Sequence, residues 1–153
     1  MNTTELVSQL ARSFKTAARQ LKQRHGGRHT LEITDEYDCQ DLFHVLLRIF
    51  FSDIREEEWV PSYAGGNKRM DFLLPEYRLA IELKHARKSL TAKEVGDELV
   101  IDVKNYQTHP NVRHLVCIVF DKEGWIKNPA GIEKDLTKTH DGTLVTRVVI
   151  VDY

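Results

Sequence analysis

The chain has 153 residues and a net charge of −1; 41% of its residues are apolar and 29% are charged, as expected for one globular domain. No run of about 18 apolar residues occurs, so a membrane-spanning helix is not expected. The first residues show neither the basic nor the apolar segment of a secretory signal. Cys39 and Cys117 lie in apolar runs without CxxC spacing, which indicates buried free thiols and a cytoplasmic protein.

Residues 4–24 are predicted to form one amphipathic helix, which Gly26-Gly27 ends. Its apolar face carries residues at helical spacing: Leu6, Leu10, Phe14, Ala17 and Leu21. A basic stripe lies beside this face and consists of Arg12, Lys15, Arg19 and Lys22. Two interpretations of the stripe stay open: a solvated surface, or a row of cations along phosphate groups.

A second helix is predicted over residues 35–51, where apolar residues cover almost the whole circumference, as is typical of a buried helix. One polar row at i, i+4 spacing interrupts them: Glu36, Gln40, His44 and Arg48. Such a row on a buried helix must face water, a partner or a functional site. For His44 itself, a place in the core is the favoured interpretation.

The next segment is predicted to be rich in strands. A short strand is expected at 59–63, followed by a Gly-rich loop at 64–68 that lacks the GK[ST] ending of a phosphate-binding P-loop. Two strands at 69–74 and 79–85 form a hairpin across residues 75–78.

A capping box at Thr91 and Glu94 opens a third helix, which His109-Pro110 ends. Its inner side carries Val95, Leu99, Val103 and Tyr106, the last of them favoured as a core residue over a base-stacking one. Residues 114–120 form a continuous apolar run, which predicts a strand covered on both faces. Asn128-Pro129 starts a short helix, and residues 143–151 form the last strand. This order contains an α-β-β-β-α-β pattern, which indicates a mixed sheet between helices.

The predicted hairpin brings charged residues together. With a four-residue connection at 75–78, or a two-residue loop at 76–77, Leu74 pairs with Leu79, and Asp71 then lies opposite Glu82. Directly opposed residues point to one face of a sheet. Lys84 lies two residues beyond Glu82, so it shares that face. The other face is apolar and carries Phe72, Leu74, Leu79, Ile81 and Leu83.

Two opposed carboxylates repel each other, and either Lys84 or a divalent cation could offset this repulsion. Mg²⁺ suits a site with one or two carboxylates that leaves positions for a substrate phosphate, and it lowers the pKa of a bound water. Lys84 could orient that water, or help to deprotonate it if its own pKa is depressed. The alternative is a surface ladder of charges without catalysis; the apolar neighbours within residues 79–84 favour a buried strand instead.

Met70-Asp71, followed after ten residues by Glu82-Leu83-Lys84, resembles the PD-(D/E)xK nuclease signature, with methionine in place of the usual proline. The α-β-β-β-α-β order is also the core of that superfamily. Residues 36–44 (EYDCQDLFH) and 62–73 (SYAGGNKRMDFL) look like the nuclease domain of DpnII/MboI-type restriction endonucleases and related phage-defence effectors. The resemblance extends over residues 35–136, and the N-terminal helix lies outside it.

The resemblance implies hydrolysis of DNA phosphodiester bonds with Mg²⁺, for which Mn²⁺ is an expected substitute. Asp71 and Glu82 would bind the metal together with the backbone carbonyl group of Leu83, and Lys84 would position the attacking water. An acid on the first core helix often completes such sites. Glu36 is the leading candidate for this acid, and Asp41 is the alternative.

Further residues around the motif are candidates for nucleic-acid contacts. Arg69 could contact a phosphate or pair with an acid, and Lys68 and Ser62 are weaker candidates of the same kind. His85 and Lys88 follow the motif and could line a DNA groove or be ordinary solvated residues.

We therefore expect a restriction-endonuclease-like α/β fold in one domain, with residues 1–30 as a helical extension and residues 35–153 as the nuclease core. The expected function is Mg²⁺-dependent DNA cleavage in prokaryotic restriction or phage defence. Cutting both strands favours a homodimer. A chain of this length has little room for a base-reading module, so a partner protein could supply specificity or regulation. The alternatives are a non-catalytic nucleic-acid-binding module, an interaction subunit of a larger defence complex, and an RNA substrate.

Overall fold

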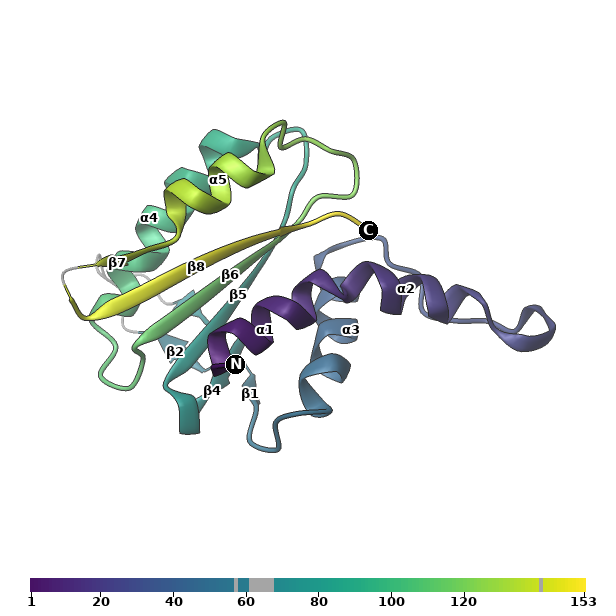
Figure 1. Ribbon diagram of the computed structural model, residues 1–153, viewed down its shortest axis with the longest axis horizontal. Helices are drawn as coiled ribbons and strands as arrows, with labels where there is room; N and C mark the ends of the chain where they lie inside the picture. The colour runs from purple at the N-terminus through teal and green to yellow at the C-terminus, as the bar shows by residue number, and fades with distance from the viewer. Residues whose placement is uncertain (57, 61–67, 141) are drawn as a thin grey trace.

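A mixed six-stranded sheet with helices on both faces forms the centre of the molecule (Figure 1). The computed structural model describes residues 1–56, 58–60, 68–140 and 142–153. In sheet order the strands are β1 (Arg55–Glu56), β4 (Phe72–Leu74), β5 (Leu79–His85), β6 (His114–Phe120), β8 (Leu144–Val151) and β7 (Lys138–His140). The neighbours β5, β6 and β8 run parallel, and the remaining pairs are antiparallel. The predicted α/β class with a mixed sheet is confirmed.

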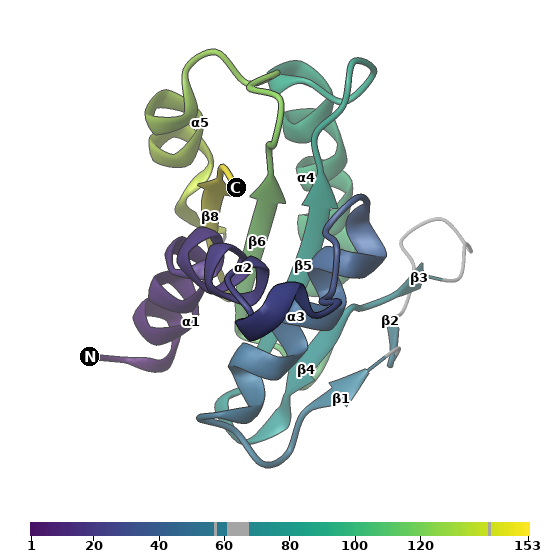
Figure 2. The ribbon, with the colours of Figure 1, turned by 90° about the vertical axis from the view of Figure 1, so that its right-hand side faces the viewer.

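Two apolar clusters hold the helices against the sheet (Figure 2). On one face lie α1 (Thr3–Arg12), α2 (Phe14–Lys22) and α3 (Glu36–Arg48). On the other lie α4 (Ala92–Gln107) and α5 (Pro129–Leu136). The central strand β6 contributes to both clusters and is buried along nearly its whole length, as its apolar run predicts. Both cysteines are buried and free, also as predicted.

The hairpin of β4 and β5 has the predicted register. Phe72 pairs with Ile81 and Leu74 with Leu79. A 3-10 turn, η2 (Pro75–Tyr77), makes the connection, and Arg78 completes it with a left-handed φ of 50°. The apolar face of the hairpin packs into the cluster that contains α1 and α3. Because that face is buried, a shift by one residue would turn the apolar side chains away from the core.

The single helix predicted over residues 4–24 is wrong: the structure has two helices, α1 and α2, with a break at Ser13. The Ser13 hydroxyl donates to the Gln9 carbonyl oxygen at 3.0 Å, the local bond by which serine competes with helical geometry and bends helices. Of the predicted apolar face, Leu10 and Phe14 are buried, and Leu6 and Leu21 pack partly buried against the same cluster. The buried side also takes in residues that the prediction left out: Val7, Ala11 and Ala18.

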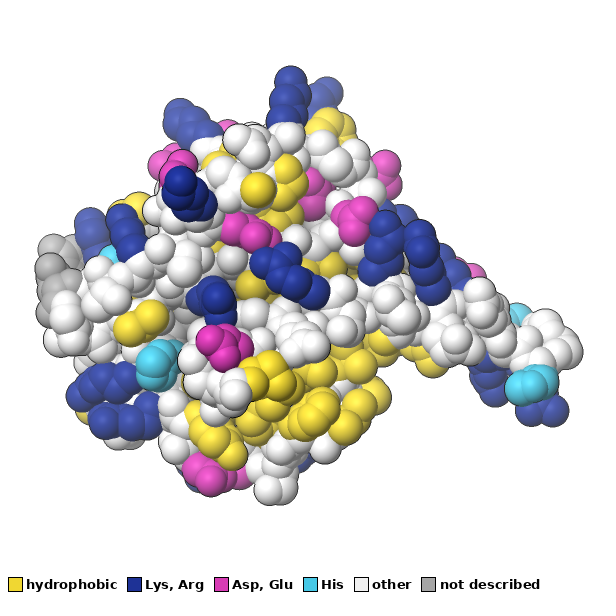
Figure 3. All heavy atoms as spheres, viewed as in Figure 1, with side chains coloured by type: hydrophobic (Ala, Val, Ile, Leu, Met, Phe, Trp, Pro, Cys, Tyr) yellow, Lys and Arg dark blue, Asp and Glu magenta, His cyan; other side chains and the backbone are white. Residues whose placement is uncertain are grey.

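Helix α3 is shorter and more exposed than predicted. It begins after the N-cap Asp35, ends at Arg48, and buries only one side, formed by Cys39, Leu42, Phe43 and Leu47. Its other side leaves Tyr37 and Val45 exposed, and Ile49 and Phe50, which follow the helix, are exposed as well. Figure 3 shows the apolar surface below α1 in this region. The prediction of an all-round buried helix fails because the sheet and the helices α1 and α2 cover α3 from one side only.

The strands before the hairpin also differ from the prediction. The segment expected as a strand at 59–63 contains β2 (Trp59–Val60), which pairs with β3 (Lys68–Arg69) in a separate two-stranded sheet. The rest of that segment and most of the Gly-rich loop, residues 61–67, lie outside the described residues. The main sheet takes β1 as its edge instead, and the predicted strand at 69–74 is broken between β3 and β4.

The elements after the hairpin agree with the prediction, except that β7 was not expected. The capping box of Thr91 and Glu94 is present at α4, and the Asn128 side chain caps α5. Within the part of the chain that the structure describes, none of the helices has the length and apolar character that crossing a membrane requires.

Candidate active site

A cleft of about 430 Å³ lies beside the carboxyl half of β5, between the beginning of α3 and the inner side of α4. Its lining is strongly charged and consists of Glu36, Arg69, Asp71, Glu82, Leu83, Lys84, Arg87, Leu90, Glu98, Ile101 and Asp102. Four of the catalytic candidates from the sequence, Asp71, Glu82, Lys84 and Glu36, therefore line one cavity. They come from α3, from β5 and from the residue just before β4.

Asp71 and Glu82 form a carboxylate pair in which Glu82 is buried and Asp71 is partly buried. The Leu83 N–H donates to Asp71 Oδ2 at 2.7 Å and holds this side chain against β5. Burial and, next in size, the negative charge of Glu82 together raise the pKa of Asp71 to about 7, while the hydrogen bond from Leu83 acts in the opposite direction. Glu82 is 4% exposed and accepts a hydrogen bond from the Tyr106 hydroxyl. The pair is thus an electrostatically strained arrangement in which one carboxylate tends to keep its proton.

Lys84 pairs with two acids from α4. Its Nζ lies 3.0 Å from Glu98 Oε2 and 2.9 Å from Asp102 Oδ2. Burial by itself lowers the pKa of Lys84, but Cys117, Glu98 and Glu82 together outweigh it, so the pKa is raised. The amine therefore stays protonated at neutral pH, which argues against the depressed-pKa option considered from the sequence.

Glu36 is the first residue of α3, directly after the N-cap Asp35. Burial raises its pKa, and Lys84 and a bond from the His85 backbone reduce that rise. These interactions bring the Glu36 carboxylate into electrostatic contact with the hairpin. Asp41, the alternative acid, is exposed and does not line the cleft.

The candidates for nucleic-acid contacts are spread more widely. Arg69 lines the cleft and is exposed, and Lys68 precedes it in β3. Ser62 lies outside the described residues. His85 contacts the Tyr153 hydroxyl through Nε2 at 2.6 Å and is not part of the lining, and neither is the exposed Lys88.

Three site residues on α4 are absent from the sequence prediction: Glu98 and Asp102, which pair with Lys84, and Tyr106, which was expected only as core. Their spacing is i, i+4, i+8, so they form one row on the inner side of α4. This row is a signal that the sequence contains, of the same kind as the polar row noticed on α3. Arg87, which lines the cleft just after β5, is a further residue that sequence reasoning missed.

The comparison with family models gives one match. The model of the DpnII-MboI restriction endonucleases, described as REase_DpnII-MboI, matches residues 5–152. The chain belongs to this family. The match takes in α1 and α2, so the resemblance is longer than the range of 35–136 predicted from the motifs. No curated protein and no solved structure matches the chain at a significant level.

Membership of a restriction endonuclease family implies that the chain is an endonuclease and that DNA is its substrate. The mixed sheet between helices agrees with the restriction-endonuclease-like fold that the family implies.

The donor set of the cleft fits Mg²⁺ better than a softer metal. Among the described residues, no group of three or more His, Cys, Asp or Glu side chains is arranged to hold a metal ion. Mg²⁺ does not need such a group, because it keeps several waters and binds through one or two carboxylates plus substrate phosphates. The raised pKa of Asp71 indicates two carboxylates that a hard cation would stabilise in their ionised form.

Proposed function

We propose that this protein is a Mg²⁺-dependent DNA endonuclease of prokaryotic restriction or phage defence, with Asp71, Glu82, Lys84 and Glu36 as its catalytic residues. The observation that carries the proposal is the pair of carboxylates of Asp71 and Glu82, which shares a charged cleft with a protonated lysine. Nearly the whole chain matches a restriction endonuclease family, which supports the same conclusion.

Mg²⁺ would be held by the carboxylates of Asp71 and Glu82 and by the Leu83 carbonyl group, and would lower the pKa of a bound water and neutralise charge on the phosphate. The Leu83 N–H orients Asp71, and the Tyr106 hydroxyl orients Glu82. These two hydrogen bonds hold the carboxylates in place before substrate arrives, so less reorganisation is needed during the reaction.

Lys84 and Glu36 have complementary tasks in this proposal. The protonated Lys84 orients the attacking water or a phosphate oxygen, while Glu98 and Asp102 on α4 hold the amine in position. The raised pKa of Glu36 suits it to take up a proton from that water. Contacts to the DNA backbone fall to Arg69 and Arg87, which line the cleft, and to His85 and Lys88, which lie outside its lining. Lys68 and Ser62 are weaker candidates for such contacts.

We further propose that two copies of the chain act together, because cleavage of both DNA strands needs two sites. A partner protein would supply sequence specificity or regulation. A cytoplasmic location, where chromosomal and invading DNA lie, agrees with this function.

The test is cleavage of supercoiled plasmid by the purified protein with Mg²⁺ or Mn²⁺. We expect nicking and linearisation by the unchanged protein, and a loss of at least about 100-fold in Asp71→Ala and Lys84→Ala, the size of effect seen when one transition-state interaction is removed. Asp41→Ala is the matched control, because this acid is exposed on α3 and does not line the cleft.

Two outcomes would contradict the proposal. Full activity in Asp71→Ala and Lys84→Ala would show that the active site lies elsewhere in the molecule. Plasmid binding without any nicking, under either metal, would favour a non-catalytic nucleic-acid-binding module. Preferred cleavage of RNA over DNA in a parallel reaction would change the substrate class but keep the site.

A further inference from the structure

Positive charge is concentrated in one segment of the chain. Residues 6–31 contain six Lys or Arg and no Asp or Glu, whereas the rest of the chain has 16 Lys or Arg against 23 Asp or Glu. The formal charge of this segment is therefore +6, and that of the remainder is −7. The overall charge of −1 hides this polarity. A region of concentrated positive charge on an otherwise acidic protein indicates an anionic partner.

The second half of this segment projects from the body of the molecule. We call residues 15–29 the basic arm; it consists of most of α2, the turn η1 (His25–Gly27) and the residues on either side of that turn. Figure 1 shows it extending past the end of α3, and Figure 3 shows Lys, Arg and His side chains gathered along it. Residues 22–29 are all exposed. Gly26 and Gly27 have φ values of 65° and 64°, a backbone conformation that favours glycine and reverses the chain at the tip.

The cations of the segment fall into two groups. Those at its base are paired: Arg12 lies 3.0 Å from Glu133 and Lys15 lies 2.9 Å from Asp152. Towards the tip, no ion pair to another described residue involves Arg19, Lys22 or Arg28. Arg19 and Lys22 lie in the last turn of α2, where a cation stabilises the helix dipole, so this effect explains their positive charge in part. It does not apply to Arg28, which lies beyond that helix. Ion pairs within the protein thus give a structural reason for the cations at the base of the segment, but not for those towards the tip of the arm.

The arm is connected to the active-site cleft. The chain leaves it at Thr30, is anchored by the buried Ile33, and reaches the cleft at Glu36. The seven-residue step from His29 to Glu36 spans at most about 24 Å, which is less than one turn of B-DNA at about 34 Å. A duplex with its scissile phosphate at the cleft is therefore long enough for its backbone to reach the His29 end of the arm.

We infer that the basic arm binds the phosphate backbone of duplex DNA outside the catalytic cleft and supplies sequence-independent affinity for the substrate. This inference rests on the proposed function for the identity of the anion. Among the described cavities, one of about 250 Å³ reaches the base of the arm at Lys15 and Thr16, and residues 17–29 line none of them. The outer part of the arm instead carries long, exposed cations, which suit an extended polyanion. In this arrangement the acidic body keeps DNA from other faces, and the arm directs it towards the cleft.

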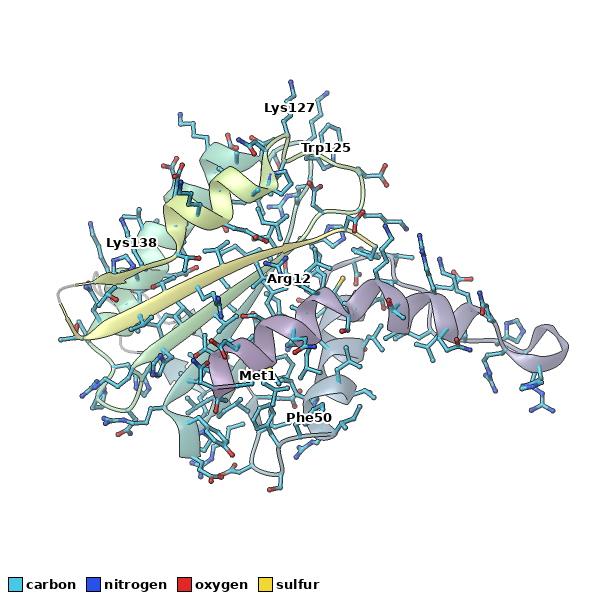
Figure 4. The ribbon with its side chains drawn as sticks, in the orientation of Figure 1. Met1, Arg12, Phe50, Trp125, Lys127 and Lys138 are labelled. Atoms are coloured by element: carbon cyan, nitrogen blue, oxygen red, sulfur yellow. The ribbon has the colours of Figure 1, made fainter. Side chains whose placement is uncertain are left out.

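The test is binding of a short blunt duplex to the full chain, followed by fluorescence anisotropy in EDTA so that no cleavage occurs. The arm variant is Arg19→Gln/Lys22→Gln/Arg28→Gln; Arg24 is kept because it donates to the His29 carbonyl oxygen and shapes the tip. The matched control is Lys127→Gln/Lys134→Gln/Lys138→Gln, which removes the same charge from exposed residues in α5, in β7 and in the loop before α5. Figure 4 labels Lys127 and Lys138. Equal melting temperatures for the three proteins establish that the exposed substitutions leave the fold intact.

We expect the arm variant to bind about 10- to 100-fold more weakly at 150 mM salt, with the slope of log K against log salt smaller by about 2–3, since each phosphate contact contributes about 0.9. The control variant should keep the affinity and slope of the unchanged protein.

The inference would be overturned if the two variants lost equal amounts of affinity for the duplex, or if the arm variant kept the salt slope of the unchanged protein. It would also be overturned if the protein bound single-stranded RNA or anionic lipid vesicles more tightly than duplex DNA. The same experiments distinguish a failure of the proposed function from a failure of this inference. If the unchanged protein binds duplex without cutting it, the catalytic proposal fails, and the salt slope still decides the role of the arm. Arg28→Glu alone gives a second measurement outside α2 and should weaken duplex binding at least as much as Arg28→Gln.

Discussion

Asp71→Asn should stabilise the protein while removing its activity. Burial and the adjacent Glu82 raise the pKa of Asp71 from 3.8 to about 7. At 1.36 kcal/mol per pKa unit, keeping this carboxylate ionised costs the folded state about 4 kcal/mol above pH 7. Asparagine has nearly the same shape, and its amide oxygen can still accept the Leu83 N–H, but it has no charge to bury. Since burial of the amide has its own cost, we expect a gain of about 2–4 kcal/mol in the free energy of unfolding at pH 8.

The gain should depend on pH in a defined direction. Below pH 3.8, Asp71 is protonated in both the folded and the unfolded protein, so the variant has no advantage. Between pH 3.8 and about 7, the unfolded chain releases the proton while the folded protein keeps it, and the cost to the unchanged protein grows. Above about pH 7 the cost is complete and the difference reaches its plateau.

Urea denaturation in EDTA at pH 4.5, 6 and 8, followed by circular dichroism, measures this difference. Asp41→Asn is the matched control, because Asp41 is exposed and should show no such gain. Addition of Mg²⁺ at pH 8 should stabilise the unchanged protein more than Asp71→Asn, since the cation offsets the charge that the variant lacks. An Asp71→Asn protein that is no more stable at pH 8, or whose advantage is the same at every pH, would refute the electrostatic reasoning.

Three further substitutions test the contacts around the cleft. Asp102→Asn should lower the free energy of unfolding by about 3–5 kcal/mol, because it removes one partner of a buried ion pair with Lys84; equal stability in urea would contradict this. Glu98→Gln, at a carboxylate that is 45% exposed, should lower the free energy of unfolding by less than about 1 kcal/mol in the same assay. A larger loss in Glu98→Gln than in Asp102→Asn would contradict the expectation that Asp102 is the more stabilising partner of Lys84. Tyr106→Phe should cost about 1–3 kcal/mol and reduce the cleavage rate, because Glu82 loses a buried donor; an unchanged rate at saturating DNA would show that Tyr106 has no positioning role.

The sequence predicted the hairpin and its charged face correctly because local rules suffice there. A connection of even length sets the pairing, and the alternation of apolar and charged residues allows only one register in which the apolar face is buried. The same holds for the caps at Thr91 and Asn128, whose partners lie three residues away. The family signature, read on Asp71, Glu82 and Lys84, falls within this locally determined segment.

Elements that depend on distant neighbours were predicted less well. The periodicity of residues 4–24 hides the break at Ser13, whose hydroxyl donates to the Gln9 carbonyl oxygen. The apolar residues of α3 predict burial, but how many of its sides are covered depends on where α1, α2 and the sheet end. The strand expected at 59–63 has the composition of a strand, but composition does not say which strand it pairs with. Its pairing with β3, and not with the main sheet, depends on the tertiary structure.

The sequence by itself determined which residues share the face of the hairpin, since that follows from the two-residue period of a strand and from the length of one turn. Only the tertiary structure decided their chemical states. Asp71 has a pKa of about 7 because burial and Glu82 act on it together. Lys84 is kept protonated with the help of Glu98 and Glu82, and Tyr106 holds Glu82. Glu98 and Tyr106 lie on α4, far along the chain from the carboxylates and the lysine they act on, and only the packing of that helix on the sheet brings them into contact.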